Sequence, residues 1–284
     1  MIVILGGGPA GRIASIRLAT AGKQVTLVEH GGIGGQCLHS GCMPVCALND
    51  VARLIHATRD LRNLGVVDGV PVPDFPALLT KMGEIQQKIA SILDEETRSA
   101  GVDIIYGRTG RFDGERTWAG NEQLKAEAVI AATGSRPFVP QIPGIDLPGV
   151  FISRTLPEMK KLPKKLAIIG GSVAAAEFAY IFRNFGCDVT ILSRSTFLKE
   201  SDSHIRTLAV KELAGITIRE NTPVVSIRGK DRVDSVLTPL GEVEADAVFL
   251  AAGLVPNSEM LNGVKKGSLG EVMVDYRMRT SIAD

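Results

Sequence analysis

Apolar and polar positions follow one another along the chain in an order that predicts the same unit twice. Residues 2–30, IVILGGGPAGRIASIRLATAGKQVTLVEH, run from an apolar segment through a glycine turn into a helix-like stretch and end in a second apolar segment. Residues 166–194, LAIIGGSVAAAEFAYIFRNFGCDVTILSR, follow the same plan. The two glycine turns begin at Gly6 and Gly170, 164 residues apart. The pattern therefore predicts two strand–helix–strand modules of an α/β protein.

Each module also has matching ends. Its helix-like stretch stops at a glycine, Gly22 in the first module and Gly186 in the second. Two later apolar segments, VIAATGSRP at 129–137 and VFLAAGLVPN at 248–257, each reach a glycine with a proline shortly after it. We expect each of these segments to close the sheet of its module.

Two stretches outside the modules have distinct compositions. Residues 136–149, RPFVPQIPGIDLPG, contain four prolines, which is typical of a stiff linker, so we place the domain boundary there. Residues 75–99 carry apolar side chains at helical spacing with charges between them, which predicts one core-facing helix. Its apolar positions are Phe75, Leu78, Leu79, Met82, Ile85, Ile89, Ile92 and Leu93.

The first glycine turn has the pattern G-x-G-x-x-G, formed by Gly6, Gly8 and Gly11. The first glycine allows the tight turn, the second lets a pyrophosphate approach the backbone at a helix N-terminus, and the third lets helix and strand pack closely. Glu29, 23 residues after Gly6, ends the next predicted strand, where a carboxylate accepts hydrogen bonds from a ribose. The motif in this context predicts dinucleotide binding; a merely tight strand–helix turn is the alternative.

The second turn departs from this pattern, because Ser172 and Ala175 replace its second and third glycines. At the position that corresponds to Glu29, the second module has Ser193 followed by Arg194. A carboxylate would repel a ribose 2′-phosphate, whereas serine and arginine can bind one, so the pattern favours NADPH, with NADH as the alternative. An Arg194 that simply points into solvent would remove this preference.

Composition and charge narrow the choice of partners. The 284 residues suffice for two domains, and 32 Lys and Arg against 31 Asp and Glu leave no net charge that indicates nucleic acid or an anionic membrane surface. Residue 2 already begins an apolar segment, and no apolar run reaches the roughly 18 residues of a membrane span. We therefore expect a cytoplasmic protein with small-molecule partners, no nucleic-acid partner and no membrane contact.

Three of the four cysteines lie in residues 34–50, GGQCLHSGCMPVCALND. A glycine before Cys42 and a proline two residues after it predict that Cys42 begins a helix, and a helix N-terminus favours the thiolate. Cys37 and Cys42 could cycle between disulfide and dithiol. A structural disulfide is the second interpretation, and a metal or iron–sulfur site that adds Cys46 and a fourth ligand such as His39 is the third.

These segments together resemble a known family. GGQCLHSGCMPVCAL is similar to the redox segment of the flavoprotein disulfide reductases, which include dihydrolipoamide dehydrogenase, glutathione reductase and mercuric reductase. GGGPAG with Glu29 resembles their FAD motif, AATGSRP their second flavin-side motif, GGSVAAAEFA their pyridine-nucleotide motif and AAGLVPN its close. The resemblance covers nearly the whole chain, and GGSVAAAE is most similar to the mercuric reductase branch.

The resemblance implies a fold and a domain order. It implies an α/β fold with two Rossmann-like, three-layer domains that bind FAD and NAD(P), the second inserted in the first. Residues 1–146 would bind FAD and carry the redox cysteines, 147–262 would bind NAD(P), and 263–284 would return towards the FAD domain. The segment EVMVDYRMRTSIAD resembles the lead into one more strand, a Gly-Asp flavin motif and a dimerisation domain. We therefore expect a truncated form of a longer homodimeric reductase, with weaker or no dimerisation of its own.

The resemblance also implies an electron route from NADPH through FAD to a Cys37–Cys42 disulfide, and on to a small-molecule or protein disulfide or a related acceptor. Cys37 would attack the substrate and Cys42 would lie against the flavin, while Glu177 falls where the family has a glutamate near the nicotinamide. The residues that the resemblance assigns to the cofactors are Gly6, Gly8, Pro9, Ala10, Gly11, Glu29, His30, Gly35, Gln36, Gly110, Thr133, Gly134, Gly170, Ser172, Val173, Ala174, Glu177, Ser193, Arg194 and Gly253.

Two features depart from the family. Cys46 stands where the family usually has a lysine near the flavin, one helical turn after Cys42, so we treat it as a further redox candidate beside the alternative of a small filler. The family's His-Glu acid/base pair has no counterpart, since none of the four histidines has a glutamate at the matching spacing. These histidines are His30, His39, His56 and His204. The fourth cysteine, Cys187, begins a predicted strand, where we expect it to be buried.

Two other functions fit parts of the sequence. A compact flavoprotein similar to thioredoxin reductase suits the length, although that type carries its cysteines in the pyridine-nucleotide domain. A non-catalytic nucleotide-binding redox sensor would use the cysteines as a switch without turnover.

Overall fold

The computed structural model describes residues 1–282 and groups them into two compact units. The first unit consists of Met1–His39, Glu84–Arg136 and the chain from Leu254 on; the second consists of Ser40–Gly83 and Pro137–Gly253. The chain thus leaves the first unit and returns to it, which agrees with the predicted insertion and α/β class. The domain ranges 1–146, 147–262 and 263–284 stay a prediction, because these units describe packing and not nucleotide binding.

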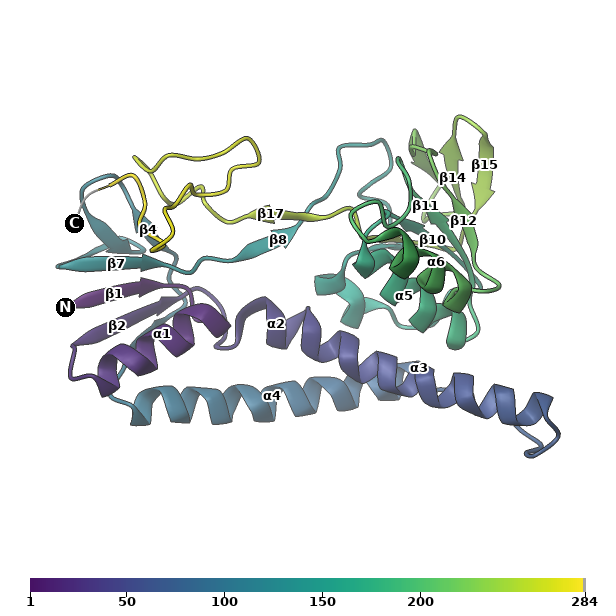
Figure 1. Ribbon diagram of the computed structural model, residues 1–284, viewed down its shortest axis with the longest axis horizontal. Helices are drawn as coiled ribbons and strands as arrows, with labels where there is room; N and C mark the ends of the chain where they lie inside the picture. The colour runs from purple at the N-terminus through teal and green to yellow at the C-terminus, as the bar shows by residue number, and fades with distance from the viewer. Residues whose placement is uncertain (283–284) are drawn as a thin grey trace. The chain divides into compact units, whose positions relative to one another are not determined.

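The first unit is built on a parallel sheet of order β3-β2-β1-β7 (Figure 1). Its strands are β1 (Ile2–Leu5), β2 (Val25–Glu29), β3 (Asp103–Tyr106) and β7 (Ala128–Ala131). Helices α1 (Pro9–Thr20) and α2 (Gly35–His39) belong to this unit, as does the later part of α4 (Phe75–Ser99). The predicted close at 129–137 is confirmed, since β7 lies beside β1 at the edge of the sheet.

Strand β1 alternates between two cores, as a central strand covered on both faces should. Ile4 packs in a core with apolar residues of α1 and α4. Val3 and Leu5 pack in another core with residues of a small antiparallel sheet. That sheet consists of β4 (Gly110–Phe112), β5 (Thr117–Ala119) and β6 (Glu122–Leu124). The first unit therefore has the three layers that were predicted.

The second unit has a parallel sheet of order β12-β11-β10-β16-β9. Its strands are β9 (Val150–Phe151), β10 (Lys165–Ile169), β11 (Asp188–Leu192), β12 (Thr217–Arg219) and β16 (Ala247–Leu250). The antiparallel strands β13 (Ser226–Arg228), β14 (Ser235–Thr238) and β15 (Gly241–Glu244) form a second layer. The helices are α3 (Cys42–Asn63), α5 (Val173–Asn184), α6 (Ser203–Glu212) and the 3-10 helix η1 (Ser153–Glu158). The segment 248–257, which we expected to close this sheet, contributes β16 beside β10. The edge of the sheet is instead β9, whose two residues are too few to show a pattern in the sequence.

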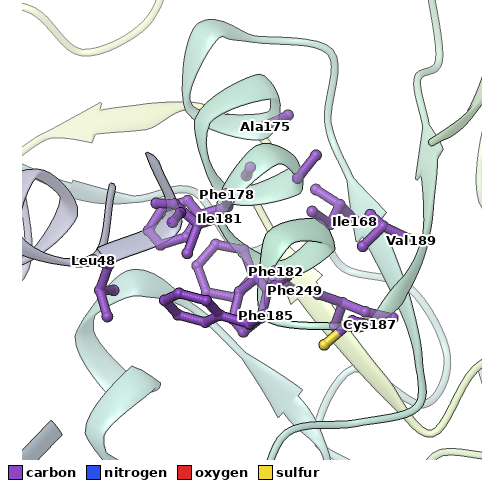
Figure 2. Close-up of a cluster of buried hydrophobic side chains, with 14 of the residues drawn as sticks. Leu48, Ile168, Ala175, Phe178, Ile181, Phe182, Phe185, Cys187, Val189 and Phe249 are labelled. Atoms are coloured by element: carbon purple, nitrogen blue, oxygen red, sulfur yellow. The ribbon is translucent and has the colours of Figure 1, made fainter. Parts of the chain in front are cut away.

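A cluster of aromatic side chains fills the core between this sheet and its helices (Figure 2). Phe182 of α5 lies 6.0 Å from Phe249 of β16 and 6.3 Å from Phe75, which begins α4, measured between ring centroids. Leu48 of α3 belongs to the same core, and so does Cys187, which is buried as predicted. Burial raises the pKa of the Cys187 thiol to about 12. The helix that begins with Cys42 is thus held in the second unit by apolar packing.

The predicted helix 75–99 is confirmed, but its predicted core-facing side is only partly correct. Phe75 and Met82 are buried, whereas Ile85 and Ile92 are 52% and 47% exposed. At about 100° per residue, the buried positions and Leu93 share one face of the helix, and Ile85 and Ile92 lie about 100° around the axis from it. Apolar spacing alone did not reveal which of the two stripes would pack.

The proline-rich stretch 136–149 is not a free linker. Ile142, Ile145 and Leu147 pack against the core beneath the antiparallel strands of the second unit. Strand β8 (Ser135–Pro137), at its start, pairs with β17 (Leu254–Pro256). The stiffness that the proline content predicted stays a prediction, and that content did not show that the apolar residues between the prolines are packed. No helix of residues 1–282 is long and apolar enough to cross a bilayer.

Candidate functional site

In the first glycine turn, two glycines are required by the chain's own packing. Gly6 has a φ of 107°, and a Cβ there would lie 2.3 Å from the carbonyl oxygen of Ala132. A Cβ on Gly11 would lie 1.9 Å from the carbonyl oxygen of Gly6. No side chain fits at either place without moving backbone, which agrees with the predicted tight turn and close helix–strand contact.

Gly8 differs from its two neighbours in the motif. Its φ is −67°, and the nearest atom to a Cβ there would be the Cα of Gly35, 3.9 Å away. The chain itself therefore leaves this space open. Gly8 caps α1 without a side-chain hydrogen bond, and Pro9 and Ala10 are exposed in the first helical turn. Uncapped N–H groups and the helix dipole at this end favour an anion, so the site fits the pyrophosphate of FAD.

Glu29, at the end of β2, is fixed across this turn by two backbone donors. The N–H of Gly7 donates to its Oε2 at 2.5 Å and the N–H of Gly31 to its Oε1 at 2.7 Å. A carboxylate has about four lone-pair sites, so two remain for a ribose diol. The loop after β2 is tied to the turn as well, since the N–H of Gly34 donates to the carbonyl of Gly7 at 2.9 Å.

Four other predicted flavin-side residues gather around the same loops of the first unit. Thr109 Oγ1 lies 3.2 Å from His30 Nδ1, and Ser135 Oγ donates to Gln36 Oε1 at 3.4 Å. Gly35 has a φ of 55°, and a Cβ there would lie 2.7 Å from the Cα of Gly8. The remaining residue is Gly110, where a Cβ would lie 2.7 Å from Cδ2 of Leu5. Packing against Leu5 is therefore sufficient to explain the glycine at this position.

Asn257 positions the turn at Thr133 and Gly134, and the sequence prediction missed it. Its Nδ2 donates to the carbonyl of Thr133 and its N–H to that of Gly134, both at 2.9 Å. Arg136 Nη1 donates to Asn257 Oδ1 at 2.9 Å and Arg136 Nη2 to Glu259 at 2.6 Å. The signal was present, because Asn257 ends the segment VFLAAGLVPN, but nothing in one sequence indicated that its amide reaches back 124 residues.

In the second unit, the glycine turn after β10 is also closed by backbone. Gly170 has a φ of 147°, and a Cβ there would lie 2.1 Å from the carbonyl oxygen of Ala251. Ser172 caps α5: its Oγ accepts from the N–H of Ala175 at 3.4 Å and donates to the carbonyl of Ala251 at 3.2 Å. The Ser172 hydroxyl thus accepts a hydrogen bond from an N–H group at the start of α5, whereas no side chain caps the start of α1. Val173 and Ala174, which follow it, are exposed.

Ser193 and Arg194 have different surroundings. Ser193 is 1% exposed, its hydroxyl donates to the carbonyl of Ser195 at 2.8 Å, and a Cβ on Gly171 would lie 2.2 Å from its Oγ. Its hydroxyl proton is therefore already used within the chain. Arg194 is exposed, and no hydrogen bond or ion pair within residues 1–282 involves it. Of the two predicted phosphate ligands, Arg194 is the one with donors available.

Glu177 and Gly253 complete the predicted nucleotide residues of the second unit. Glu177 lies on the exposed side of α5, and partial burial of its carboxyl group raises its pKa above the usual value. Gly253 has a φ of 112° with open space around it, and its carbonyl accepts from the N–H of Phe138 at 2.9 Å. The positive φ is what requires glycine there.

The three clustered cysteines are divided between the two units. Cys37 is partly buried in α2 of the first unit, and Cys42 and Cys46 are exposed in α3 of the second. The prediction that Cys42 begins a helix is confirmed: it is the first residue of α3, after the cap Gly41. The pairing of Cys37 with Cys42 stays a prediction. Within residues 1–282, no group of three or more His, Cys, Asp or Glu side chains could hold a metal ion.

With this geometry described, comparison with known proteins identifies the family. A family model described as pyridine nucleotide-disulphide oxidoreductase matches residues 1–284. The chain belongs to this family. The chain is similar to a mercuric reductase of Shigella flexneri, 32% identical over 99% of this chain and 53% of that protein. It is also similar to a dihydrolipoyl dehydrogenase of Acholeplasma laidlawii, 31% identical over 92% of this chain and 80% of that protein. The chain spans about half the length of the mercuric reductases it matches, 53% to 54%.

A solved structure agrees with this assignment. The HOCl-induced flavoprotein disulfide reductase RclA from Escherichia coli matches with a TM-score of 0.83 and 29% identity, over 99% of this chain and 63% of that protein. The resemblance stated from the motifs is therefore confirmed at the level of the oxidoreductase family and its α/β fold.

The two classes of glycine in the first turn lead to a testable difference. Gly11→Ala should destabilise the cofactor-free chain by about 1–3 kcal/mol, because the new Cβ meets backbone. Gly8→Ala should change the free energy of unfolding by less than about 0.5 kcal/mol but weaken FAD binding about tenfold or more, because the open space is where the pyrophosphate would approach. Urea unfolding followed by circular dichroism and titration with FAD measure the two effects. Unchanged FAD affinity in Gly8→Ala would contradict this assignment.

Proposed function

We propose that this chain provides the two nucleotide-binding modules and the dithiol of an FAD-dependent NAD(P)H:disulfide oxidoreductase. The observation that carries the proposal is the open space at Gly8, at the uncapped start of α1, where the chain leaves room for a pyrophosphate to approach its backbone. Family membership supports the reaction type. The open space at Gly8 supports FAD in the first module, and the exposed Arg194, which follows a serine where the first module has Glu29, supports NADPH in the second.

Bound FAD would supply a two-electron carrier between NADPH and the cysteines. The residues of the chain hold and orient the reactants. Glu29 would bind the ribose of FAD and the first turn of α1 its pyrophosphate, and Glu177 lies on the helix that starts at the second turn. Oxidation of NADPH to NADP⁺, with uptake of one proton, would thereby reduce a Cys37–Cys42 disulfide by two electrons to the dithiol.

The dithiol then reduces the acceptor by thiol–disulfide exchange. The Cys37 thiolate attacks one sulfur of the external disulfide and releases the other as a thiolate. The Cys42 thiolate attacks Cys37 in this mixed disulfide, which releases the second product thiol and restores the Cys37–Cys42 disulfide. Cys42 is the first residue of α3, at a helix end that has no side-chain cap. We place this cycle in a reducing compartment such as the cytoplasm, and we propose a homodimer for the longer protein.

The experiment that tests the proposal is an anaerobic titration of the purified chain with NADPH, followed by visible spectroscopy. We expect a yellow chromophore that bleaches and a long-wavelength band from a thiolate beside the flavin. A colourless chain that binds NADPH would contradict flavin binding by this chain. Oxidation of the thiols that changes shape or partner, without flavin reduction by NADPH, would favour a redox sensor instead.

The choice of NADPH over NADH is tested by Arg194→Gln. We expect the dissociation constant for NADPH to rise about 10- to 100-fold and that for NADH to stay the same, since hydrogen bonds to a charged phosphate contribute about 1.5–3 kcal/mol. Arg228→Gln is the matched control, because it removes one positive charge from the same unit at an arginine paired with Glu242. An unchanged ratio of the two constants in Arg194→Gln would rule out this arginine as the phosphate ligand.

A further inference from the structure

A pocket of about 370 Å³ lies in the second unit, lined by the second half of α3 and the C-terminal ends of α5 and α6. Each helix contributes a cationic side chain to its lining: Arg59 from α3, Arg183 from α5 and Lys211 from α6. Among the described residues that line it, Glu212 is the only one with a carboxylate side chain. Ligand sites in proteins have volumes of about 300–1,000 Å³, so this α3–α5–α6 pocket has the size for a small molecule and the charge for an anion.

Arg183 is held in this pocket by packing. Its guanidinium lies against Gly215, where an added Cβ would be 3.1 Å from Nη2 and 3.2 Å from Nε. The Nε atom is buried, and no hydrogen bond or ion pair within residues 1–282 involves this arginine. A buried donor without an acceptor lowers stability, and a strong acceptor at the neighbouring Nη groups would offset that loss. Arg183 is therefore placed for a partner that the described part of the chain does not supply.

The C-terminal end of α5 does not need Arg183 either. A cation in the last turn of a helix often binds the open carbonyl groups there. In α5 the carbonyl of Arg183 accepts from the N–H of Gly186 at 3.1 Å, and that of Asn184 accepts from Arg59 Nη2 at 3.3 Å. Arg59 Nη1 also donates to Asn184 Oδ1 at 2.9 Å, which fixes this side chain beside the pocket through uncharged acceptors. Neither arginine has a carboxylate partner among the described residues.

The acidic groups near the pocket do not cancel this positive charge. Asp60 is exposed outside the lining and lies towards His56, with its Oδ2 3.6 Å from Nε2. The other ring nitrogen of His56, Nδ1, lies 3.1 Å from the hydroxyl of Tyr180, and the two rings stack with their centroids 5.7 Å apart. The C-terminal ends of α5 and α6 add about half a negative charge each. Together with Glu212, these helix ends still leave the three cations of the lining in excess.

We propose that the α3–α5–α6 pocket binds a small phosphomonoester, with the phosphate held by Arg59, Arg183 and Lys211. The organic group would lie against the ring of Tyr180. A phosphomonoester carries a charge of about −1.5 to −2 at pH 7 and has three terminal oxygens, which suits three cations that come from three helices. A guanidinium binds phosphate oxygens through two parallel N–H donors. The volume of about 370 Å³ leaves room beside the phosphate for an organic group.

Calorimetric titration of the full chain with phenyl phosphate, in a phosphate-free buffer, tests this site. We expect succinate, which also carries two negative charges, to bind at least about tenfold more weakly, because its carboxylates do not present three oxygens at one point. Arg183→Gln should weaken binding of phenyl phosphate about 10- to 100-fold, because hydrogen bonds to a charged phosphate are lost. Glu212→Gln should tighten it about two- to fivefold, because a negative charge that faces the anion is removed. Arg228→Gln, at an arginine paired with Glu242 outside the pocket, is the matched control and should leave the affinity unchanged.

The Glu212→Gln variant separates binding from folding, because Glu212 is exposed and a loss of fold would weaken binding instead of tightening it. Unchanged affinity in Arg183→Gln, weaker binding in Glu212→Gln or equal affinity for succinate would overturn the site. Loss of binding in Arg194→Gln would assign the phosphate to the second glycine turn instead. The pocket shares no residue with either glycine turn or with the cysteine segment. A chain that shows no flavin reduction by NADPH would therefore contradict the proposed function and leave the binding of phenyl phosphate unaffected.

Discussion

Replacing Cys42 with serine is expected to abolish NADPH-dependent disulfide reduction, with a loss in turnover of about 10³-fold or more. A serine hydroxyl at the start of α3 cannot form the disulfide that stores the electron pair, and it is a far weaker nucleophile than a thiolate at neutral pH. The long-wavelength band in the visible spectrum should disappear as well. Turnover is measured as oxidation of NADPH in the presence of a small aromatic disulfide.

The control for Cys42→Ser separates loss of chemistry from loss of fold. Ala47→Ser places a new hydroxyl at an exposed position of the same helix and should keep the turnover of the parent. Cys42→Ser itself should bind FAD and NADPH as the parent does, because Cys42 is exposed and no core residue is removed. If the long-wavelength band survives in Cys42→Ser, a different cysteine lies against the flavin.

Replacing Phe182 with alanine is expected to lower the stability of the second unit by about 3–5 kcal/mol. Phe182 is 0% exposed and has Phe75, Phe178 and Phe249 as ring neighbours, so its removal leaves a cavity lined by large, rigid side chains. The same core holds Leu48 of α3. The variant should therefore also loosen the helix that presents Cys42.

Cys187 provides a local probe for this prediction. It belongs to the same core, and burial raises its pKa, so its thiol can be alkylated only when the unit opens. With Cys37, Cys42 and Cys46 replaced by serine, it is the one thiol left in the chain. Phe182→Ala should then increase its alkylation rate about 10² to 10³-fold or more. Leu240→Ala, at a side chain 72% exposed in the same unit, should leave the rate near that of the parent. A Phe182→Ala rate within tenfold of the parent would mean that the cluster does not control opening.

The sequence alone determined the features that depend on local chemistry. The glycine turns, the helix stops at Gly22 and Gly186, and the helix start at Cys42 were all predicted, because backbone conformation at a turn or cap depends on a few adjacent residues. The matched spacing of the two modules and the segments around the cysteines were also sufficient to state the family. The pattern of apolar segments predicted two strand–helix–strand modules, and each of them lies in a parallel sheet.

The tertiary structure decided which of several positions that look alike in the sequence are buried or hydrogen-bonded within the chain. Gly8 and Gly11 look alike in the motif, yet only Gly11 is closed by backbone from a preceding turn. Ser193 and Arg194 were predicted together, but the Ser193 hydroxyl donates to Ser195 and only Arg194 remains exposed. Burial and hydrogen bonding depend on the element that packs opposite, often a hundred or more residues away, as Asn257 and Thr133 illustrate. A single sequence carries no direct signal of that partner, so these choices became visible only when the chain was folded.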